Sequence, residues 1–228
     1  MQPMRALFLH GWGFGPDVWV PVLDRLGWNG VMTPDLGFLD AVRPHADEAL
    51  ERIRQDGCPV LAVGHSLGFL WLASQDGWPA GSRFVGINAF GCFAARADFA
   101  QGTAPRILAR MLKGLQTDAR DVVNAFRTTC GATALPTDCP VNTDHLRVGL
   151  DMLMQADARK RLASMAEGIG VLGGRQDKVV PPAMLAASLP PETTIEWLEG
   201  GHLLPLTNPD ECARFLRGMA RHMEQPGA

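Results

Sequence analysis

Short runs of apolar residues alternate along the chain with longer segments in which apolar residues recur at helical spacing. Each short run predicts a strand, and the runs occupy residues 6–9, 30–33, 60–63, 84–87, 169–172 and 194–197. None of them shows the strict polar alternation of a strand that faces water on one side. The predicted strands are therefore expected to be buried on both faces, as in a parallel sheet.

Helical patterns separate these runs, as at residues 46–55, 67–75 and 210–222. In the last of them the apolar positions lie three and four residues apart, at Cys212, Phe215, Leu216 and Met219. Such alternation is typical of an α/β protein, because each crossover helix packs back onto a parallel sheet. The pattern predicts a doubly wound, mostly parallel sheet with helices on both faces.

The alternation stops between residues 92 and 168, where only helical patterns remain. Their apolar stripes are Ile107, Leu108, Met111, Leu112 and Leu115, then Val122, Val123 and Phe126, and then Leu146, Leu150, Leu153 and Met154. A helical insertion between two strands predicts a cap over the ends of the sheet. We therefore expect a core made of residues 1–91 and 169–228 and a helical cap made of residues 92–168.

Composition supports one globular unit with an inserted subdomain and excludes several classes of protein. The chain has 228 residues, of which 46% are hydrophobic and 20% charged, and its formal net charge is −3. This weakly acidic balance gives no electrostatic reason to expect nucleic acid as a partner. No stretch of about 18 apolar residues is present, so we expect no membrane span.

The N-terminal residues and the cysteines bear on location. No basic region, long apolar stretch and cleavage site follow one another after Met1, so we expect no signal peptide and a cytoplasmic protein. The five cysteines include no C-x-x-C pair. This argues against a zinc site and favours idle thiols in a reducing compartment.

The strongest chemical signal is Gly64-His65-Ser66-Leu67-Gly68, which fits the pattern G-x-S-x-G. The pattern alone is weak, but here it follows a predicted strand and opens a predicted helix, which is the context of a nucleophile elbow. Glycines suit this turn because backbone crowds against backbone where the strand meets the helix. The turn leaves the Ser66 hydroxyl projecting as a candidate nucleophile. The alternative is an ordinary turn in which Ser66 caps the helix.

A serine hydroxyl needs a base at neutral pH, and the sequence contains six histidines. His202 lies in Gly200-Gly201-His202, directly after the predicted strand 194–197, and parallel sheets place their sites at the carboxyl ends of strands. We therefore predict His202 as the base, with a structural loop histidine as the alternative. The other histidines lie in tight turns or polar helical contexts: His10, His65, His45, His145 and His222.

The base needs a carboxylate to fix its tautomer and to stabilise the imidazolium. Asp177 follows the predicted strand 169–172, so it has the same strand-end placement. The order Ser66, Asp177, His202, with gaps of 111 and 25 residues, is typical of α/β-hydrolases and differs from the two main serine protease orders. Asp35 is the rival carboxylate, but Pro34-Asp35-Leu36-Gly37 is better explained as a turn.

Two backbone amides are candidates for stabilising a developing oxyanion. Leu67 follows Ser66 at the start of the predicted helix, so its amide points toward the reacting centre. The second donor is expected in the loop after the first strand, where glycines on either side let the Trp12 amide turn toward the oxyanion. The Trp12 side chain is expected to line an acyl pocket or to pack in the core, and the two roles are compatible.

With these motifs in place, the chain resembles the α/β-hydrolases along nearly its whole length. More narrowly, it resembles the pimeloyl-[acyl-carrier protein] methyl ester esterases of biotin synthesis. The shared features are His-Gly-Trp-Gly followed by Trp19, the stretch 92–96, and the cap segment from Leu115 to Phe126. The resemblance implies an α/β-hydrolase fold and cleavage of the methyl ester of a pimeloyl chain held on acyl carrier protein, which releases methanol.

The resemblance also implies roles for individual residues. It assigns a triad and two oxyanion donors, namely Ser66, Asp177 and His202 for the triad and Trp12 and Leu67 for the oxyanion hole. Within the cap, it implies that residues 111–115 touch the acyl chain, among them Met111 and Leu115. It further points to arginines that bind the carrier protein, with Arg120 near a family arginine and three others in the same region, Arg106, Arg110 and Arg127.

The distribution of charge bears on the carrier protein. Residues 92–168 hold ten Lys/Arg against eight Asp/Glu, a net charge of +2, whereas the remainder of the chain has a net charge of −5. A basic cap suits an acidic carrier protein and its phosphate. An ordinary mixed-charge helical surface gives the same count and is the alternative explanation.

The sequence therefore predicts a serine carboxylesterase that needs no metal and no organic cofactor. Three alternatives use the same fold: a general short-chain carboxylesterase without a carrier partner, a lyase-like or peroxidase-like enzyme, and a non-catalytic receptor that binds a small molecule. The complete Ser-Asp-His set argues against the receptor. Only a comparison of substrates separates the two esterases.

Overall fold

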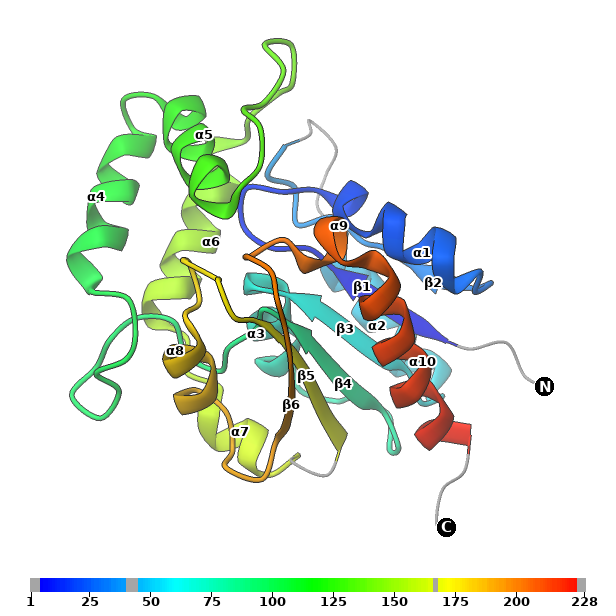
Figure 1. The fold of residues 1–228 in the computed structure, drawn as a ribbon. Coiled ribbons are helices and arrows are strands. Elements are labelled where there is room, and N and C mark those ends of the chain that lie inside the picture. Colours follow the sequence, from blue (N-terminus) through cyan, green and yellow to red (C-terminus); the bar gives the residue numbers. More distant parts are fainter. Residues whose placement is uncertain (1–4, 40–44, 166–167, 225–228) are drawn as a thin grey trace.

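The computed structural model describes residues 5–39, 45–165 and 168–224, and its strands form one sheet in the order β2-β1-β3-β4-β5-β6 (Figure 1). The strands are β1 (Ala6–Leu9), β2 (Val31–Met32), β3 (Leu61–His65), β4 (Arg83–Ile87), β5 (Ile169–Gly174) and β6 (Thr194–Leu198). Each neighbouring pair is parallel, so the carboxyl ends of the strands lie at one edge of the sheet. The parallel α/β sheet predicted from the sequence is confirmed.

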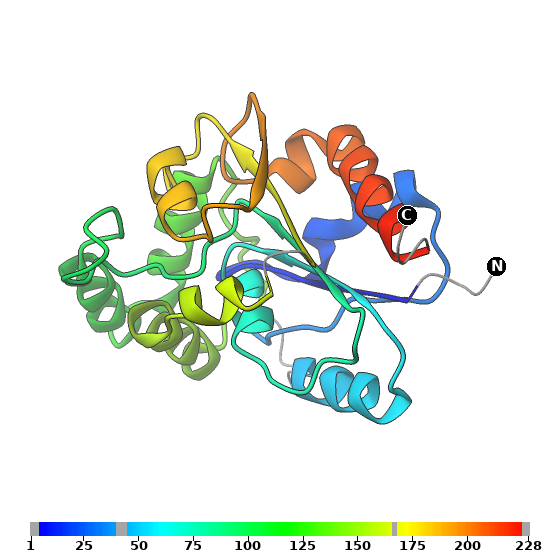
Figure 2. The same ribbon diagram turned by 90° about the horizontal axis from the view of Figure 1, so that it is seen from below.

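Helices cover both faces of the sheet. Outside the cap they are the 3-10 helix η1 (Pro16–Trp19), α1 (Val20–Leu26), α2 (Ala46–Asp56), α3 (Leu67–Ala73), α8 (Pro182–Ala187), α9 (Leu204–Thr207) and α10 (Pro209–Glu224). Figure 2 shows α1 and α10 on one face and α2 and α3 on the other. The ends of α2, α3 and α10 lie within two residues of the predicted positions. Of the helices described, none has the length and apolar character needed to span a bilayer.

The side chains of β1 show why the strands lack polar alternation. Leu7 and Leu9 belong to the hydrophobic core on the side of α2 and α3, whereas Ala6 and Phe8 belong to the core on the side of α1 and α10. All four side chains are fully buried. Successive residues of a strand point to opposite faces, so a strand covered by helices on both sides is apolar at every position.

The described residues between β4 and β5 contain the helices α4 (Pro105–Leu115), α5 (Ala119–Cys130), α6 (Thr143–Gln155) and α7 (Arg159–Ala163). The first of these packs against both α5 and α6 (Figure 1). These helices lie within residues 92–168, and the division of the chain at those two positions stays a prediction.

The beginning of this segment differs from the purely helical pattern that the sequence predicts. Residues 92–104 form loops joined by isolated bridges, such as Ala94 with Thr103. The reason is a close backbone contact, because a Cβ at Gly102 would lie 2.5 Å from the backbone nitrogen of Ala95. The chain therefore folds back on itself before Pro105 begins α4.

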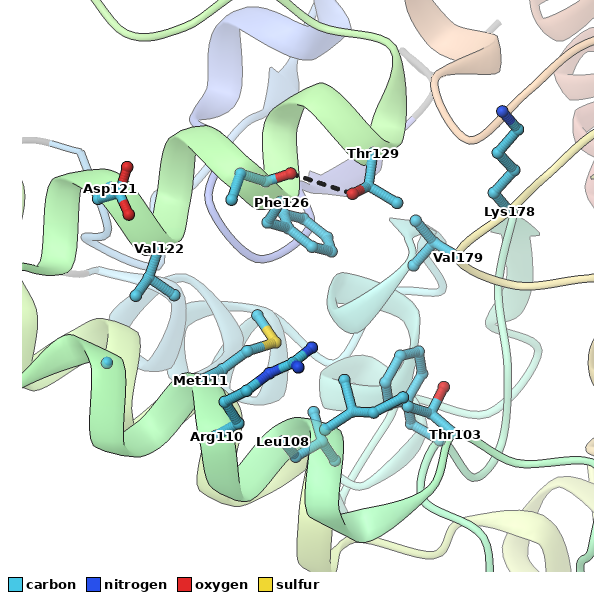
Figure 3. Close-up of a pocket in the computed structure, with 14 residues that line it drawn as sticks. Thr103, Leu108, Arg110, Met111, Asp121, Val122, Phe126, Thr129, Lys178 and Val179 are labelled. Atoms are coloured by element: carbon cyan, nitrogen blue, oxygen red, sulfur yellow. Dashed lines mark hydrogen bonds between the residues drawn. The ribbon is translucent and has the colours of Figure 1, made fainter.

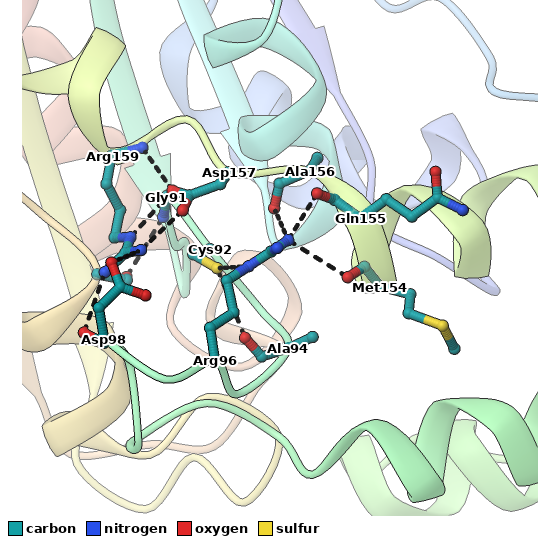
Figure 4. A network of polar contacts seen from close by, with 11 residues as sticks. Gly91, Cys92, Ala94, Arg96, Asp98, Met154, Gln155, Ala156, Asp157 and Arg159 are labelled. Carbon is teal, nitrogen blue, oxygen red and sulfur yellow. Dashed lines mark hydrogen bonds and ion pairs between the residues drawn. The ribbon is translucent and has the colours of Figure 1, made fainter.

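Two arginines hold the ends of the cap segment together, as Figure 4 shows. Arg159 forms ion pairs with Asp157 at 2.7 Å and with Asp98 at 2.8 Å. A cation at a helix C-terminus meets the negative end of the helix dipole. The Arg96 guanidinium lies at the C-terminus of α6, where it donates hydrogen bonds to the carbonyl groups of Met154, Gln155 and Ala156.

The cap is also hydrogen-bonded to the loop that follows β1. Trp12 donates from its indole Nε1 to the carbonyl oxygen of Leu146 in α6, at 2.8 Å. Arg127 in α5 donates to the Gly13 carbonyl oxygen at 3.1 Å, and its guanidinium carbon lies 4.7 Å from the centre of the Phe14 ring. These contacts hold α5 and α6 next to the carboxyl end of β1.

A glycine lets α3 lie close to β1, and its replacement should destabilise the fold. A Cβ at Gly68 would lie 2.3 Å from the Leu9 carbonyl oxygen and 2.6 Å from that of His10. Backbone atoms cannot move aside without shifting the helix from the strand. We expect Gly68→Ala to lower the free energy of unfolding, measured in urea titrations, by about 1–3 kcal/mol.

Gly218 in α10 provides the matched control, because a Cβ there meets nothing within 4 Å. Gly218→Ala should be neutral or stabilising by up to about 1 kcal/mol, since alanine favours a helix over glycine. Equal stability of the two variants would contradict the close packing of α3 on β1.

Candidate active site

Ser66 occupies the turn between β3 and α3 in a backbone conformation that few L residues adopt. Its φ is 54° and its ψ is −123°. The preceding Gly64 makes the sharp turn possible, because a Cβ there would lie 2.3 Å from the backbone nitrogen of Phe69. This is the geometry of a nucleophile elbow, with the serine at the carboxyl end of a strand.

Three loops bring Ser66, His202 and Asp177 into one hydrogen-bonded chain. The Ser66 Oγ lies 3.1 Å from His202 Nε2, and His202 Nδ1 lies 2.8 Å from Asp177 Oδ2. Because a carboxylate only accepts, His202 donates from Nδ1, and the lone pair on Nε2 is left to accept the serine proton. All three residues are buried. The arrangement can therefore activate the Ser66 hydroxyl as a nucleophile.

Hydrogen bonds hold the Asp177 carboxylate in place and keep it ionised. Its Oδ1 accepts from the amides of Val179 and Val180 at 2.8 and 2.9 Å, and its Oδ2 accepts from Asn88 Nδ2 at 2.7 Å. Burial alone would raise the pKa of Asp177, but the facing His202 and the two amides hold the pKa below its ordinary value. The charged carboxylate can therefore stabilise an imidazolium on His202.

The rival carboxylate, Asp35, lies in a different environment. Its Oδ1 is 2.9 Å from His10 Nε2 and accepts from the Gly37 amide at 2.6 Å. The second contact spans two residues and is the turn expected of Pro-Asp-Leu-Gly. Asp35 therefore pairs with His10 rather than with His202, and it stabilises the loop after β2.

Two buried side chains outside the predicted triad lie against the loop of His202. The Nε2 atom of His65 lies 2.8 Å from the His202 carbonyl oxygen, and the two ring centres are 4.9 Å apart. Asn88 donates to the Gly201 carbonyl oxygen at 3.2 Å as well as to Asp177. A sequence signal existed for both, since His65 ends β3 within the elbow motif and Asn88 directly follows β4.

The two predicted oxyanion donors flank Ser66. Leu67 is the first residue of α3 and follows the serine directly. The loop that contains Trp12 lies against the serine from another side, because a Cβ at Gly11 would come within 3.0 Å of the Ser66 Cβ. Leu67 and the loop of Trp12 are thus both next to Ser66. Their role as oxyanion donors stays a prediction.

A cavity of about 490 Å³ lies between α4, α5 and the loop after β5 (Figure 3). The Phe126 ring, which lines it, has its centre 6.4 Å from that of His202, so the cavity lies beside the triad. Most of the wall is apolar, and it includes Leu108, Met111, Val122, Phe126 and Val179.

Two expectations about this cavity have different outcomes. Met111 lines it, whereas Leu115 is 3% exposed, belongs to the hydrophobic core and is not part of the lining. The Trp12 side chain does not line it either, because its indole packs behind Phe126 with 5.0 Å between the ring centres and bonds to α6. The tryptophan therefore has the packing role that the sequence allowed.

The four arginines predicted to bind a carrier protein divide into two pairs. Arg106 and Arg110 are exposed on α4, and Arg110 also lines the cavity, beside Met111 in Figure 3. The other two arginines form hydrogen bonds with backbone carbonyl groups of this chain. Arg120 donates to the carbonyl oxygens of Pro136 and Cys139, and Arg127 donates to those of Thr133 and Gly13.

Known proteins resemble this chain over nearly its full length. Residues 6–215 match the family model of the alpha/beta hydrolase family. The chain is 28% identical over 244 residues to the pimeloyl-[acyl-carrier protein] methyl ester esterase of Vibrio vulnificus (strain CMCP6), with 96% of this chain and 95% of that protein covered. It is 24% identical to the protein of the same name from Xylella fastidiosa (strain M23), with 92% of each covered.

A solved structure shows the same fold at a greater evolutionary distance. The bromoperoxidase from Bacillus anthracis superposes with a TM-score of 0.78 and 16% sequence identity, and the match covers 96% of this chain and 92% of that one. At this identity the likeness extends to the fold alone.

Asp177→Asn should separate the two carboxylates functionally. The variant loses the charge opposite His202 and favours the wrong tautomer of the imidazole, so kcat for p-nitrophenyl butyrate should fall by about 10⁴-fold while the fold is retained. Asp35→Asn is the matched control, since it removes the same charge beside a different histidine, and it should have a much milder effect. The opposite ranking would make Asp35 the acid.

Burial of His65 makes the stability of the protein fall in mild acid. The pKa of His65 falls from 6.5 to about 3, first because the ring is fully buried and second because His202 lies beside it. Between these values the unfolded chain binds a proton that the folded chain does not. We therefore expect the free energy of unfolding to decrease by about 1.4 kcal/mol for each pH unit between 6.5 and about 3.

Replacing His65 by glutamine removes this titration. In urea unfolding at pH 7 and pH 5, the wild type should lose about 2 kcal/mol more than His65→Gln. Equal losses in the two proteins would mean that His65 is not neutral in the folded state.

Proposed function

The chain belongs to the alpha/beta hydrolase family, and from that premise we propose that it is a serine carboxylesterase that hydrolyses the methyl ester of pimeloyl-[acyl-carrier protein] in biotin synthesis. The observation that carries this chemistry is the hydrogen-bonded chain of Ser66, His202 and Asp177, with 3.1 and 2.8 Å between the paired atoms. These residues supply a nucleophile, a base and a carboxylate that orients the base, and the proposed reaction needs no metal or organic cofactor.

Acylation begins when Ser66 attacks the carbonyl carbon of the ester. His202 takes the hydroxyl proton on Nε2 as the new bond forms, and Asp177 stabilises the resulting imidazolium. The amides of Trp12 and Leu67 donate to the tetrahedral oxyanion. Collapse of this intermediate expels methanol, which takes its proton from His202, and leaves an acyl-serine.

Deacylation repeats these steps with water in place of the serine. His202 removes a proton from the water as its oxygen attacks the acyl-serine carbonyl, and the same two amides stabilise the second oxyanion. The Ser66 oxygen leaves with the proton from His202. The products are the free carboxylate and the regenerated enzyme.

The proposed substrate is supported by the relatives and by the cavity. Both relatives described above are named for the pimeloyl-[acyl-carrier protein] methyl ester. A mainly apolar cavity of about 490 Å³ suits a linear acyl chain. Methanol is a small leaving group, which suits a nucleophile that is only 4% exposed.

An exposed face of α4 supports the proposed carrier partner. Arg106, Arg110 and Lys113 are spaced by four and three residues, so they share one face of the helix. All three are exposed, and Arg110 extends from this face to the cavity. A basic strip beside the cavity suits an acidic carrier protein whose acyl chain enters there.

A general short-chain carboxylesterase is the second candidate. The observation that favours it is that Arg120 and Arg127 make their hydrogen bonds within the chain, which leaves a smaller basic surface for a carrier protein than the sequence suggests. This enzyme would use the same triad and the same cavity. The two candidates therefore differ only in substrate.

Reversal of charge on α4 distinguishes them. The double variant Arg106→Glu/Lys113→Glu should raise KM for the carrier-bound methyl ester several-fold, because exposed pairs contribute about 0.2–1 kcal/mol each. It should leave kcat and the hydrolysis of free dimethyl pimelate nearly unchanged, as expected when uniform binding is lost. The effect should shrink in about 1 M salt, where the Debye length is about 3 Å.

Two control variants complete this experiment. Arg221→Glu reverses an exposed charge on α10 and should leave both substrates unaffected. Ser66→Ala should lower kcat for both by about 10⁴–10⁶-fold, and retention of a tenth of the activity would exclude Ser66 as the nucleophile. Saturable hydrolysis of both esters with no response to the charge reversal would favour the general carboxylesterase.

A further inference from the structure

The loop that contains His202 is anchored at Gly200, but the glycine next to the histidine has space around it. Two glycines precede the histidine. Gly200 is held, because its amide and carbonyl groups bond to Gln176 and a Cβ there would lie 2.6 Å from Leu204 Cδ2, whereas a Cβ at Gly201 would meet nothing within 4 Å. Glycine also has the greatest conformational freedom of any residue. His202 nevertheless keeps Nε2 3.1 Å from the Ser66 Oγ, a distance that matters because a misplacement of about 1 Å can lower a rate about 10²-fold.

Two side chains at the ends of neighbouring strands bind successive carbonyl groups of this loop. Asn88, which follows β4, donates from Nδ2 to the Gly201 carbonyl oxygen at 3.2 Å. His65, the last residue of β3, has its Nε2 2.8 Å from the His202 carbonyl oxygen. Both residues are fully buried, so water does not compete for these hydrogen bonds.

We propose that His65 and Asn88 act together as positioning residues, a carbonyl clamp that holds the loop of His202 in register with Ser66. This inference rests on the proposed function, in which His202 is the base. The clamp does not touch the substrate. It holds the His202 imidazole at the position from which it can accept the Ser66 proton.

The hydrogen bond to the His202 carbonyl oxygen determines which ring nitrogen of His65 carries the proton. A carbonyl oxygen only accepts, so His65 donates from Nε2–H. Its Nδ1 faces Gly11, where a Cβ would come within 2.9 Å, and it has no hydrogen-bond partner among the described residues. The ring is therefore held in the neutral Nε2–H form, which agrees with a pKa of about 3 for His65. A neutral ring beside His202 adds no charge that would oppose an imidazolium there.

Asn88 also binds the carboxylate of Asp177. Its Nδ2 also donates to Asp177 Oδ2 at 2.7 Å, the same oxygen that accepts from His202 Nδ1 at 2.8 Å. One amide group therefore fixes the carboxylate and the loop of the base relative to each other. Asn88 does so with a positive φ of 49°, a conformation that asparagine tolerates better than most residues.

A matched pair of substitutions tests the contribution of His65. His65→Gln places an amide N–H near the position of Nε2, whereas His65→Asn places the same amide near the position of Nδ1, too far from the carbonyl. We expect His65→Asn to lower kcat for p-nitrophenyl butyrate by about 10–10²-fold with KM within about twofold, and His65→Gln to restore most of that loss. Equal losses in the two variants at equal thermal stability would overturn the clamp.

Cooperation between the two residues is tested by a double-mutant cycle. Asn88→Gly keeps the positive φ and removes the donor. If both residues hold one loop, adding Asn88→Gly to His65→Asn should lower kcat by less than the product of the two separate factors, because the first removal already frees the loop. Losses that multiply would show independent action and would overturn the joint role.

Labelling by a fluorophosphonate separates the clamp from the proposed function. The reagent reports how readily Ser66 is activated without any ester, and proton NMR of the His202 Nδ1–H reports its bond to Asp177. Labelling should be slower and the proton signal broader in His65→Asn but not in His65→Gln. If the wild type hydrolysed no ester while these differences persisted, the proposed function would fail and the clamp would stand. Wild-type labelling and NMR signals in His65→Asn would overturn the clamp alone.

Discussion

The close approach of backbones around Ser66 is the constraint on which the rest of the site depends. A Cβ at Gly11, Gly64 or Gly68 would come within 2.3 to 2.9 Å of a neighbouring atom. These three glycines therefore allow the loop after β1, strand β3 and helix α3 to meet, and that meeting holds Ser66 at a positive φ with its hydroxyl beside His202. Distances set by packed backbone relax far less than distances set by side-chain rotamers.

The parallel sheet supplies the remaining groups by collecting residues that are distant in the chain. Ser66 follows β3, Asn88 follows β4, Asp177 follows β5 and His202 follows β6, and these strands are neighbours in that order. Burial then strengthens each electrostatic interaction among them. The His202 ring therefore lies next to the ionised carboxylate of Asp177 on one side and the neutral ring of His65 on the other.

Sequence patterns identify those parts of the structure in which local chemistry decides the outcome. Apolar runs locate the described strands because the central strands are buried on both faces, although the edge strands β2 and β6 are only partly buried. The elbow motif with the chain order selects three residues that the structure joins. Other outcomes depend on partners that meet only after folding. Arg127 differs from Arg106 because the Gly13 carbonyl lies within its reach, and Leu115 continues an apolar stripe but faces the core rather than the cavity. The looped residues 92–104 depend on a backbone contact that no periodicity records.

Trp12 belongs to the loop beside the nucleophile and, through its indole, to the cap. If the cap swung away as a rigid lid, the bond from Nε1 to the Leu146 carbonyl oxygen would break, or the loop against Ser66 would move with α6. The position of the cap and the shape of the loop beside Ser66 are therefore thermodynamically linked. Linkage is reciprocal, so a partner that prefers one cap position also favours one state of that loop. The Trp12 and Arg127 side chains therefore couple the arrangement of α5 and α6 to that of the loop beside Ser66.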